Sequence, residues 1–189
     1  EGDCDRVLAA LIDAGANLHL MSDWQNGPYT VLDNTDEATA RYLLTQGATL
    51  ALAPHDVNRD PASVEEAIER YGVTVMFFVP SLLEPFVDVA DPARCTSVRR
   101  VFCGGEALPP TLVARLHERF PSMLVVNLYG PTETVIAVSY WRCDRRPSAR
   151  SVPLGRPIGN TRFYVLDGLQ QPVPVGIAGE LYIGGVQLA

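Results

Sequence analysis

Short apolar runs alternate with amphipathic segments between residues 60 and 128, and this alternation most limits how the chain can fold. The runs Val73–Val79, Arg99–Cys103 and Met123–Leu128 are apolar and rich in β-branched or aromatic residues, as expected for buried strands. The segments between them begin at prolines and have helical length, at Pro80–Val87 and Pro110–Phe120. Strands separated by helices of about ten residues predict a parallel, doubly wound α/β sheet.

Another helix is expected before the first of these runs. Asp60 followed by Pro61 is the pattern of a helix N-cap and first helical residue, and Gly72 after Tyr71 is a typical stop. The apolar segment Thr49–Ala53 is expected to be a short strand.

The C-terminal part has a different pattern. Helical signals are absent beyond Thr134, and turns rich in proline and glycine connect the remaining segments. Arg162–Leu166 and Glu180–Ile183 are expected to be strands of a separate, small β-rich region.

The first fifty residues contain a weak internal repeat. Helices are expected at about Arg6–Ala14 and Asp36–Gln46, each followed by a Gly-Ala pair, with the turn-rich stretch Asp23–Asp33 between them. The spacing is close to the ankyrin period of about 33 residues, so residues 1–50 resemble degenerate, ankyrin-like helical hairpins. Two ordinary helices of an α/β layer explain the pattern equally well. The expected division is therefore residues 1–50 and residues 51–189.

Composition excludes several classes of function. The net charge is −7, and there is no basic cluster beyond Arg145-Arg146, which argues against nucleic acid as a partner. All 15 basic residues are arginine, so this chain contains no lysine for a Walker-type phosphate site or a Schiff base. No apolar run approaches the roughly 18 residues of a membrane helix. With four scattered cysteines and no signal peptide, we expect a cytoplasmic protein without a membrane partner.

Two strand ends carry candidate functional residues, because ligands of parallel sheets bind beyond the carboxyl ends of the strands. Gly104–Ala107 follows one strand, although an ordinary turn would also explain its two glycines. Asn127–Thr134 is the stronger signal, because it groups an amide, a phenol, hydroxyls and a carboxylate around a Gly-Pro turn. Tyr129 offers a stacking face, Thr132 a hydrogen-bond donor for phosphate and Glu133 a carboxylate for Mg²⁺.

The run Asn-x-Tyr-Gly-Pro-Thr-Glu-Thr resembles a signature of adenylate-forming enzymes, particularly the adenylation domains of nonribosomal peptide synthetases. Six further matches stand in family order and extend the resemblance over about residues 47–189. These matches are Leu52–Pro54, Arg59–Pro61, Phe78–Ser81, Cys103–Leu108, Val152–Asn160 and Gly179–Gly185.

The resemblance implies an enzyme that joins an amino acid to ATP, releases pyrophosphate and passes the aminoacyl group to the thiol of a carrier protein. It implies ATP/AMP and Mg²⁺ as cofactors. Tyr129 would stack on adenine, Thr132 would bind the α-phosphate and Glu133 would bind the metal, which makes Thr132 and Glu133 the catalytic residues. The implied cofactor-binding residues are Gly104, Gly105, Glu106, Ala107, Asn127, Tyr129, Gly130 and Thr132.

The resemblance also implies a pocket for the amino-acid side chain. Its lining residues would be Phe77, Val101, Cys103, Leu128, Ile136 and Ala137. All six are apolar, so a hydrophobic amino acid is the expected substrate.

Several parts of the family pattern are not found in this chain. Upstream, no match is found to the family's phosphate loop with its lysine or to the aspartate for the substrate amine. Further parts of the family pattern, including a C-terminal lid with a catalytic lysine, are expected beyond Ala189. We therefore expect a fragment of the large N-terminal subdomain that is inactive alone. The first alternative is an ankyrin-type interaction module fused to a non-catalytic relic. The second is a fatty-acid or aryl-acid ligase, which Phe78–Ser81 and Val152–Gly159 fit less well.

Overall fold

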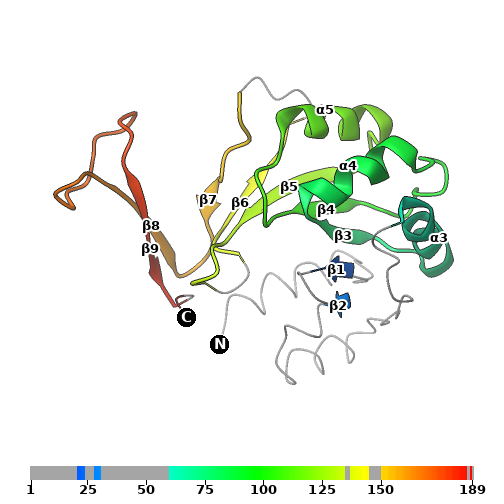
Figure 1. Ribbon diagram of the computed structural model, residues 1–189, viewed down its shortest axis with the longest axis horizontal. Coiled ribbons are helices and arrows are strands. Elements are labelled where there is room, and N and C mark those ends of the chain that lie inside the picture. The colour runs from blue at the N-terminus through cyan, green and yellow to red at the C-terminus, as the bar shows by residue number, and fades with distance from the viewer. Residues whose placement is uncertain are drawn as a thin grey trace.

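The computed structural model describes residues 21–23, 28–30, 60–134, 137–144, 150–186 and 188. The helices in this part of the chain are α3 (Pro61–Tyr71), α4 (Pro80–Val89) and α5 (Pro110–Arg119). The largest sheet contains β3 (Val75–Phe78), β4 (Arg100–Cys103), β5 (Leu124–Tyr129), β6 (Ser139–Arg142) and β7 (Arg156–Pro157). Its strands lie in the order β3-β4-β5-β6-β7 (Figure 1).

Helix α3 has the ends that its sequence predicts. The Asp60 carboxylate accepts hydrogen bonds from the backbone N–H groups of Ala62 (3.3 Å) and Ser63 (3.1 Å), as an N-cap should. Gly72 ends the helix in the left-handed conformation, with φ of 62°. Local signals were sufficient here because both caps depend only on neighbouring residues.

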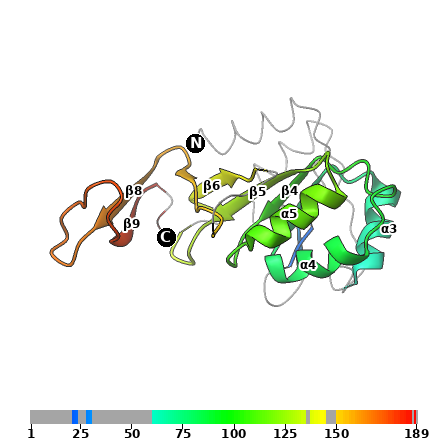
Figure 2. The ribbon, with the colours of Figure 1, turned by 90° about the horizontal axis from the view of Figure 1, so that it is seen from above.

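The prediction of a doubly wound sheet is not supported within the described residues. Strands β3, β4 and β5 are parallel and adjacent in sequence order. Right-handed crossovers between strands in such an order place the connecting helices on the same side of the sheet. Figure 2 shows α4 and α5 on one face, and α3 packs beside α4.

The prediction of an all-parallel sheet also requires correction, because the sheet is mixed. Strand β6 is antiparallel to β5, with Leu128 opposite Tyr140, and β7 is antiparallel to β6. Neither β6 nor β7 was expected from the sequence. The chain reverses after Tyr129 and returns along the same sheet, where the Val138 N–H donates to the Tyr129 carbonyl at 2.7 Å.

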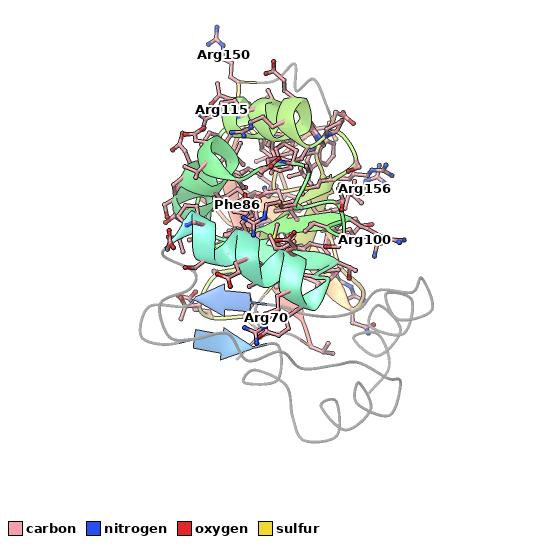
Figure 3. All side chains as sticks on the ribbon, turned by 90° about the vertical axis from the view of Figure 1, so that its right-hand side faces the viewer. Arg70, Phe86, Arg100, Arg115, Arg150 and Arg156 are labelled. Carbon is pink, nitrogen blue, oxygen red and sulfur yellow. The ribbon has the colours of Figure 1, made fainter. Side chains whose placement is uncertain are left out.

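The main core lies between the sheet and its helices. Met76 and Phe78 on β3 pack with Phe86 of α4 and with Leu112 and Leu116 of α5. The rings of Phe78 and Phe86 are 5.4 Å apart, and Figure 3 shows Phe86 in the interior, whereas Arg100 and Arg156 project outward. Burial of each large apolar side chain contributes about 1.5–3 kcal/mol, so this layer fixes the helices on the sheet.

His117 was expected on the surface of its amphipathic helix, and this prediction is wrong. It lies on α5 with only 7% of its surface exposed, in the helix whose residues Leu112, Val113 and Leu116 enter the core. The buried stripe of α5 is therefore wider than the apolar residues alone indicate.

The C-terminal strands form a separate antiparallel pair, as expected. They are β8 (Thr161–Leu166) and β9 (Glu180–Gly185), which lie to one side of the main sheet in Figure 1. Several large apolar side chains of this pair and its loops are exposed, among them Tyr164, Val175 and Ile177.

Near the N-terminus the structure describes one further antiparallel pair, β1 (Met21–Asp23) and β2 (Pro28–Thr30). Both strands fall in or beside the stretch that was expected to be turn-rich. The ankyrin-like helices expected at 6–14 and 36–46, and the strand expected at 49–53, lie outside the described residues. In the described part of the chain, no helix combines the length and apolarity needed to cross a bilayer.

Candidate active site

Three neighbouring parallel strands end at the same edge of the sheet, which brings three loops together. β3 leads into the first turn of α4, β4 into Gly104 and β5 into Gly130. Parallel α/β sheets bind their ligands beyond this carboxyl edge. The candidate residues after β4 and β5 are thus placed where chemistry is expected.

Gly104 lies in close contact with both neighbouring strands. Its N–H donates to the Phe78 carbonyl at 3.2 Å. A Cβ at this position would stand 3.2 Å from the Leu128 carbonyl oxygen and 3.2 Å from Cζ of Phe77. With a Cβ here, one of these neighbours would have to shift by a few tenths of an ångström, so glycine lets the loop backbone approach both without that shift. Gly105 follows with φ of 84°, a conformation that also favours glycine.

The Glu106 side chain connects this loop to helix α4. One carboxylate oxygen accepts the Ser81 N–H at 3.0 Å, and the other accepts the Ser81 hydroxyl at 2.9 Å. Glu106 was expected among the cofactor-binding residues, where the resemblance implied a role for its backbone. The structure adds a second role, because its carboxylate is engaged with the first turn of a helix.

A tight turn after β5 presents both candidate catalytic residues to solvent. The backbone N–H and the hydroxyl of Thr134 both donate to the Pro131 carbonyl, at 3.0 and 2.9 Å. Thr134 is buried, whereas Thr132 and Glu133 between these two residues are exposed. Thr134 was not singled out from the sequence, although a threonine three residues after a potential acceptor is a known turn signal.

Residues 152–160, which we call the strap segment, are hydrogen-bonded to side chains of β5 and β6. The Asn127 side-chain amide donates to the Pro153 carbonyl at 2.9 Å, and the Ser139 hydroxyl donates to the Leu154 carbonyl at 2.7 Å. Asn127 is only 4% exposed. This amide, expected to bind cofactor, therefore holds the strap segment in place. Tyr129, two residues later, is half-buried at the end of β5.

The expected substrate-pocket residues are not all brought together. Gly104 approaches Phe77 and Leu128 on one face of the sheet, as its contacts show. Val101 and Cys103 belong to the core beneath the helices, each with 0% exposure. Side chains of a strand alternate between faces, so Val101 and Cys103 lie on the face covered by the helices, whereas Phe77 lies on the other face.

Phe102 is a residue of β4 that shares a face with Phe77, and it was not predicted from the sequence as a lining residue. The two are paired in register, and both are half-buried. Counting alternate positions along β3 and β4 could have found Phe102. Ala137 is half-buried just before β6, and Ile136 lies outside the described residues.

The buried cysteines near the site are not prepared for nucleophilic chemistry. Burial raises the pKa of Cys103 well above its usual range. Burial also raises the pKa of Cys143 to about 11. A nucleophilic cysteine requires a lowered pKa, so these thiols act as apolar packing groups.

No cluster of three His, Cys, Asp or Glu side chains suited to a metal ion occurs in the described residues. Glu133 is exposed beside the Thr132 hydroxyl. Mg²⁺ usually binds one or two carboxylates together with the phosphates of a substrate. A single carboxylate on this turn therefore fits a magnesium ion that arrives with a nucleotide.

Comparison with known proteins identifies the family of proteins that this chain resembles. The model of the AMP-binding enzyme family matches residues 39–189. The chain therefore belongs to the AMP-binding enzyme family, and it is a segment of an adenylation domain of the nonribosomal peptide synthetase type.

Two curated relatives illustrate the similarity. The chain is 51% identical over 148 residues to "Phosphinothricin tripeptide synthetase PhsB" of Streptomyces viridochromogenes, covering 78% of this chain and 12% of the relative. It is 40% identical over 151 residues to "Enterobactin synthase component F" of Escherichia coli O157:H7, covering 76% of this chain and 12% of the relative. The chain thus spans a small part of the length of the relatives that it matches.

Solved structures agree with this assignment. The nonribosomal peptide synthetase FmoA3, solved with α-methyl-L-serine-AMP bound, superposes with a TM-score of 0.69 at 29% identity. That match covers 75% of this chain and 17% of FmoA3. None of these comparisons supports the ankyrin-like interpretation of residues 1–50. The family match begins at residue 39, within that stretch. The interaction-module alternative is therefore not favoured.

Proposed function

We propose that this chain supplies part of the nucleotide and amino-acid site of an enzyme that forms aminoacyl adenylates. The carrying observation is the carboxyl edge of β3, β4 and β5, which gathers the Gly104 loop, Tyr129 and the turn bearing Thr132 and Glu133. FmoA3 was solved with an aminoacyl adenylate bound, which supports the same ligand class here.

Each group at the edge has a proposed task. Tyr129 stacks on adenine, and the backbone of Gly104–Ala107 lines the base. Thr132 donates its hydroxyl to the α-phosphate, and Glu133 holds Mg²⁺, which neutralises the charge that develops as pyrophosphate leaves. Thr132 and Glu133 suit these tasks because both side chains are exposed on a turn that Thr134 holds closed.

The proposed amino-acid pocket is smaller than the sequence indicated. We place it on the face where Phe77, Gly104 and Leu128 meet, with Phe102 beside them. These apolar surfaces favour a hydrophobic amino acid. In the intact synthetase, the activated aminoacyl group would pass to the thiol of a carrier protein.

Binding of AMP to the chain tests the nucleotide site. Stacking on one aromatic ring is worth about 1–3 kcal/mol, and a dissociation constant of 1 mM requires about 4 kcal/mol, so we expect AMP to bind with a dissociation constant of several millimolar or weaker. In ligand-observed NMR, Tyr129→Ala should abolish the signal from AMP. Tyr164→Ala is the matched control, because Tyr164 is an exposed tyrosine on β8, outside the main sheet. Equal signals from the Tyr129→Ala and control proteins would refute the proposed site.

A comparison of adenylate analogues tests the pocket. Leucyl-sulfamoyl-adenosine should bind more tightly than AMP, whereas the aspartyl analogue should gain nothing from an apolar lining. A preference for the aspartyl compound would refute the hydrophobic assignment while leaving the nucleotide site intact.

A further inference from the structure

Helix α4 has no capping side chain of its own at its N-terminus. Its N-cap residue is Val79, whose side chain makes no capping hydrogen bond. Pro80 at the first position has no N–H, so the N–H of Ser81 is the first donor that needs an acceptor. The acceptor is Glu106, which follows the next strand of the sheet.

We propose that Glu106 is a positioning residue of the adenylate site, which clamps the Gly104–Gly105 loop to the first turn of α4. This inference rests on the proposed function, because it assigns a purpose to the loop. The clamp has two points, since both carboxylate oxygens of Glu106 are bound by Ser81. A two-point contact fixes the orientation of the carboxylate as well as its position.

The clamp constrains the part of the loop that can contact a ligand. Gly104 and Gly105 lack side chains, so only their backbone groups can hold this part of the loop. Gly104 is held on one side by its hydrogen bond to Phe78, and Glu106 secures the chain two residues later. Gly105 lies between the two anchors in a left-handed conformation, with φ of 84°.

Helix α4 is suited to serve as the fixed end of this clamp. At its C-terminus, Arg119 of α5 donates to the carbonyls of Val87 (2.5 Å) and Ala90 (2.9 Å). A carboxylate at the N-terminus and a guanidinium at the C-terminus both complement the helix dipole. Phe86 also anchors α4 in the core, with 1% exposure. The loop is thus attached to an element that is held at both ends.

The same contact engages both oxygens of the Glu106 carboxylate. Each oxygen accepts one hydrogen bond from Ser81, and the charge of the carboxylate is balanced by the helix terminus. A positioning role predicts that glutamine can replace it, because the amide retains an acceptor for the Ser81 N–H and a donor for the Ser81 hydroxyl. A role as a charged ligand predicts that glutamine fails as badly as alanine.

The test measures AMP binding by NMR titration and the amide signals of the loop in the ¹⁵N spectrum. Glu106→Ala should weaken AMP binding about fivefold to tenfold, the size expected for loss of one typical hydrogen bond. Glu106→Gln should stay within about twofold of wild type. Glu118→Ala is the matched control, because Glu118 is an exposed carboxylate on α5 away from the loop.

Signals from the ligand-free protein separate the two proposals. In Glu106→Ala, the amides of Gly104 and Gly105 should shift and the Ser81 amide should exchange faster with solvent, whereas Glu118→Ala should change neither. Unchanged loop amides in Glu106→Ala, or equal loss of binding in Glu106→Ala and Glu106→Gln, would overturn the clamp. If wild-type protein fails to bind AMP, the proposed function fails at this site, and the amide signals alone still decide whether the clamp exists.

Discussion

Substitution of Gly155 by alanine should detach the strap segment from the sheet. Gly155 has φ of 89°, and a Cβ there would stand 1.9 Å from the Tyr140 carbonyl oxygen. No side-chain rotation can relieve this overlap, because the backbone fixes the position of the Cβ and the carbonyl belongs to the backbone of Tyr140. The strap segment would have to move away from β6, and the hydrogen bonds from Asn127 and Ser139 to its carbonyls would be lost.

The magnitude follows from two contributions. A non-glycine residue in the left-handed region costs about 1–2 kcal/mol. The two lost side-chain hydrogen bonds add about 1 kcal/mol each. The free energy of unfolding should therefore fall by about 3–4 kcal/mol, a large share of the 5–15 kcal/mol typical of a domain.

Urea denaturation followed by circular dichroism measures this change. With a slope of about 2 kcal/mol per molar urea, the midpoint should fall by roughly 1.5–2 M. Gly72→Ala is the matched control, because Gly72 has φ of 62° but nothing lies within 4 Å of its added Cβ. The free energy of unfolding of Gly72→Ala should fall only by the conformational contribution of about 1–2 kcal/mol. Equal losses in the two variants would show that the strap segment is not packed against β6 as described.

Three further predictions concern a helix cap, the thiols and activity. The hydrogen bond from Ser63 holds the pKa of Asp60 below its usual 3.8, so Asp60→Ala should destabilise the protein above that pH. The difference from wild type should vanish as the pH falls through the lowered pKa, which urea midpoints across this range would show. Burial raises the pKa of Cys95 and Cys143 from 9.0 to about 11, so both should resist iodoacetamide when folded and react in urea. Stability should also decline from pH 9 to 11, because only the unfolded thiols ionise there. Finally, the chain alone should give no amino-acid-dependent ATP–pyrophosphate exchange, since all 15 of its basic residues are arginine and each missing charge-stabilising group costs about 10²–10³ in rate.

The sequence was sufficient wherever structure depends on neighbouring residues. Helix α3 begins after Asp60 and ends before Gly72, because both caps use backbone groups within one turn. Strands β3, β4 and β5 fall within a residue or two of the expected apolar runs, since burial against the helices requires apolar side chains along each strand. Element type and order are local properties of this chain.

The pairing of strands and the face of the sheet on which each side chain lies were less predictable, because both depend on residues distant in the sequence. Strand β6 contains Tyr140 and Arg142, which are exposed, so its short sequence has no strong apolar signature. Its place in the sheet comes from its backbone bonds to β5. The facing of side chains is a related case, since the resemblance places Val101 and Cys103 in the pocket, whereas only the folded sheet shows that both lie on the face covered by the helices.

The motif side chains divide into those that fasten the backbone and those left available to a ligand. Glu106, Asn127 and Thr134 each bind another part of the chain through a side-chain hydrogen bond. Thr132 and Glu133 are exposed on the turn that Thr134 holds closed. The two kinds of residue depend on each other, because a reactive group is useful only if the backbone that carries it is fixed. Sequence alone cannot separate them, since the partners of Glu106 and Asn127 lie 25 and 26 residues away along the chain. Loss of a fastening residue should therefore disturb loop geometry before any ligand arrives, whereas loss of Thr132 or Glu133 should leave the empty loop unchanged and alter only what it can bind.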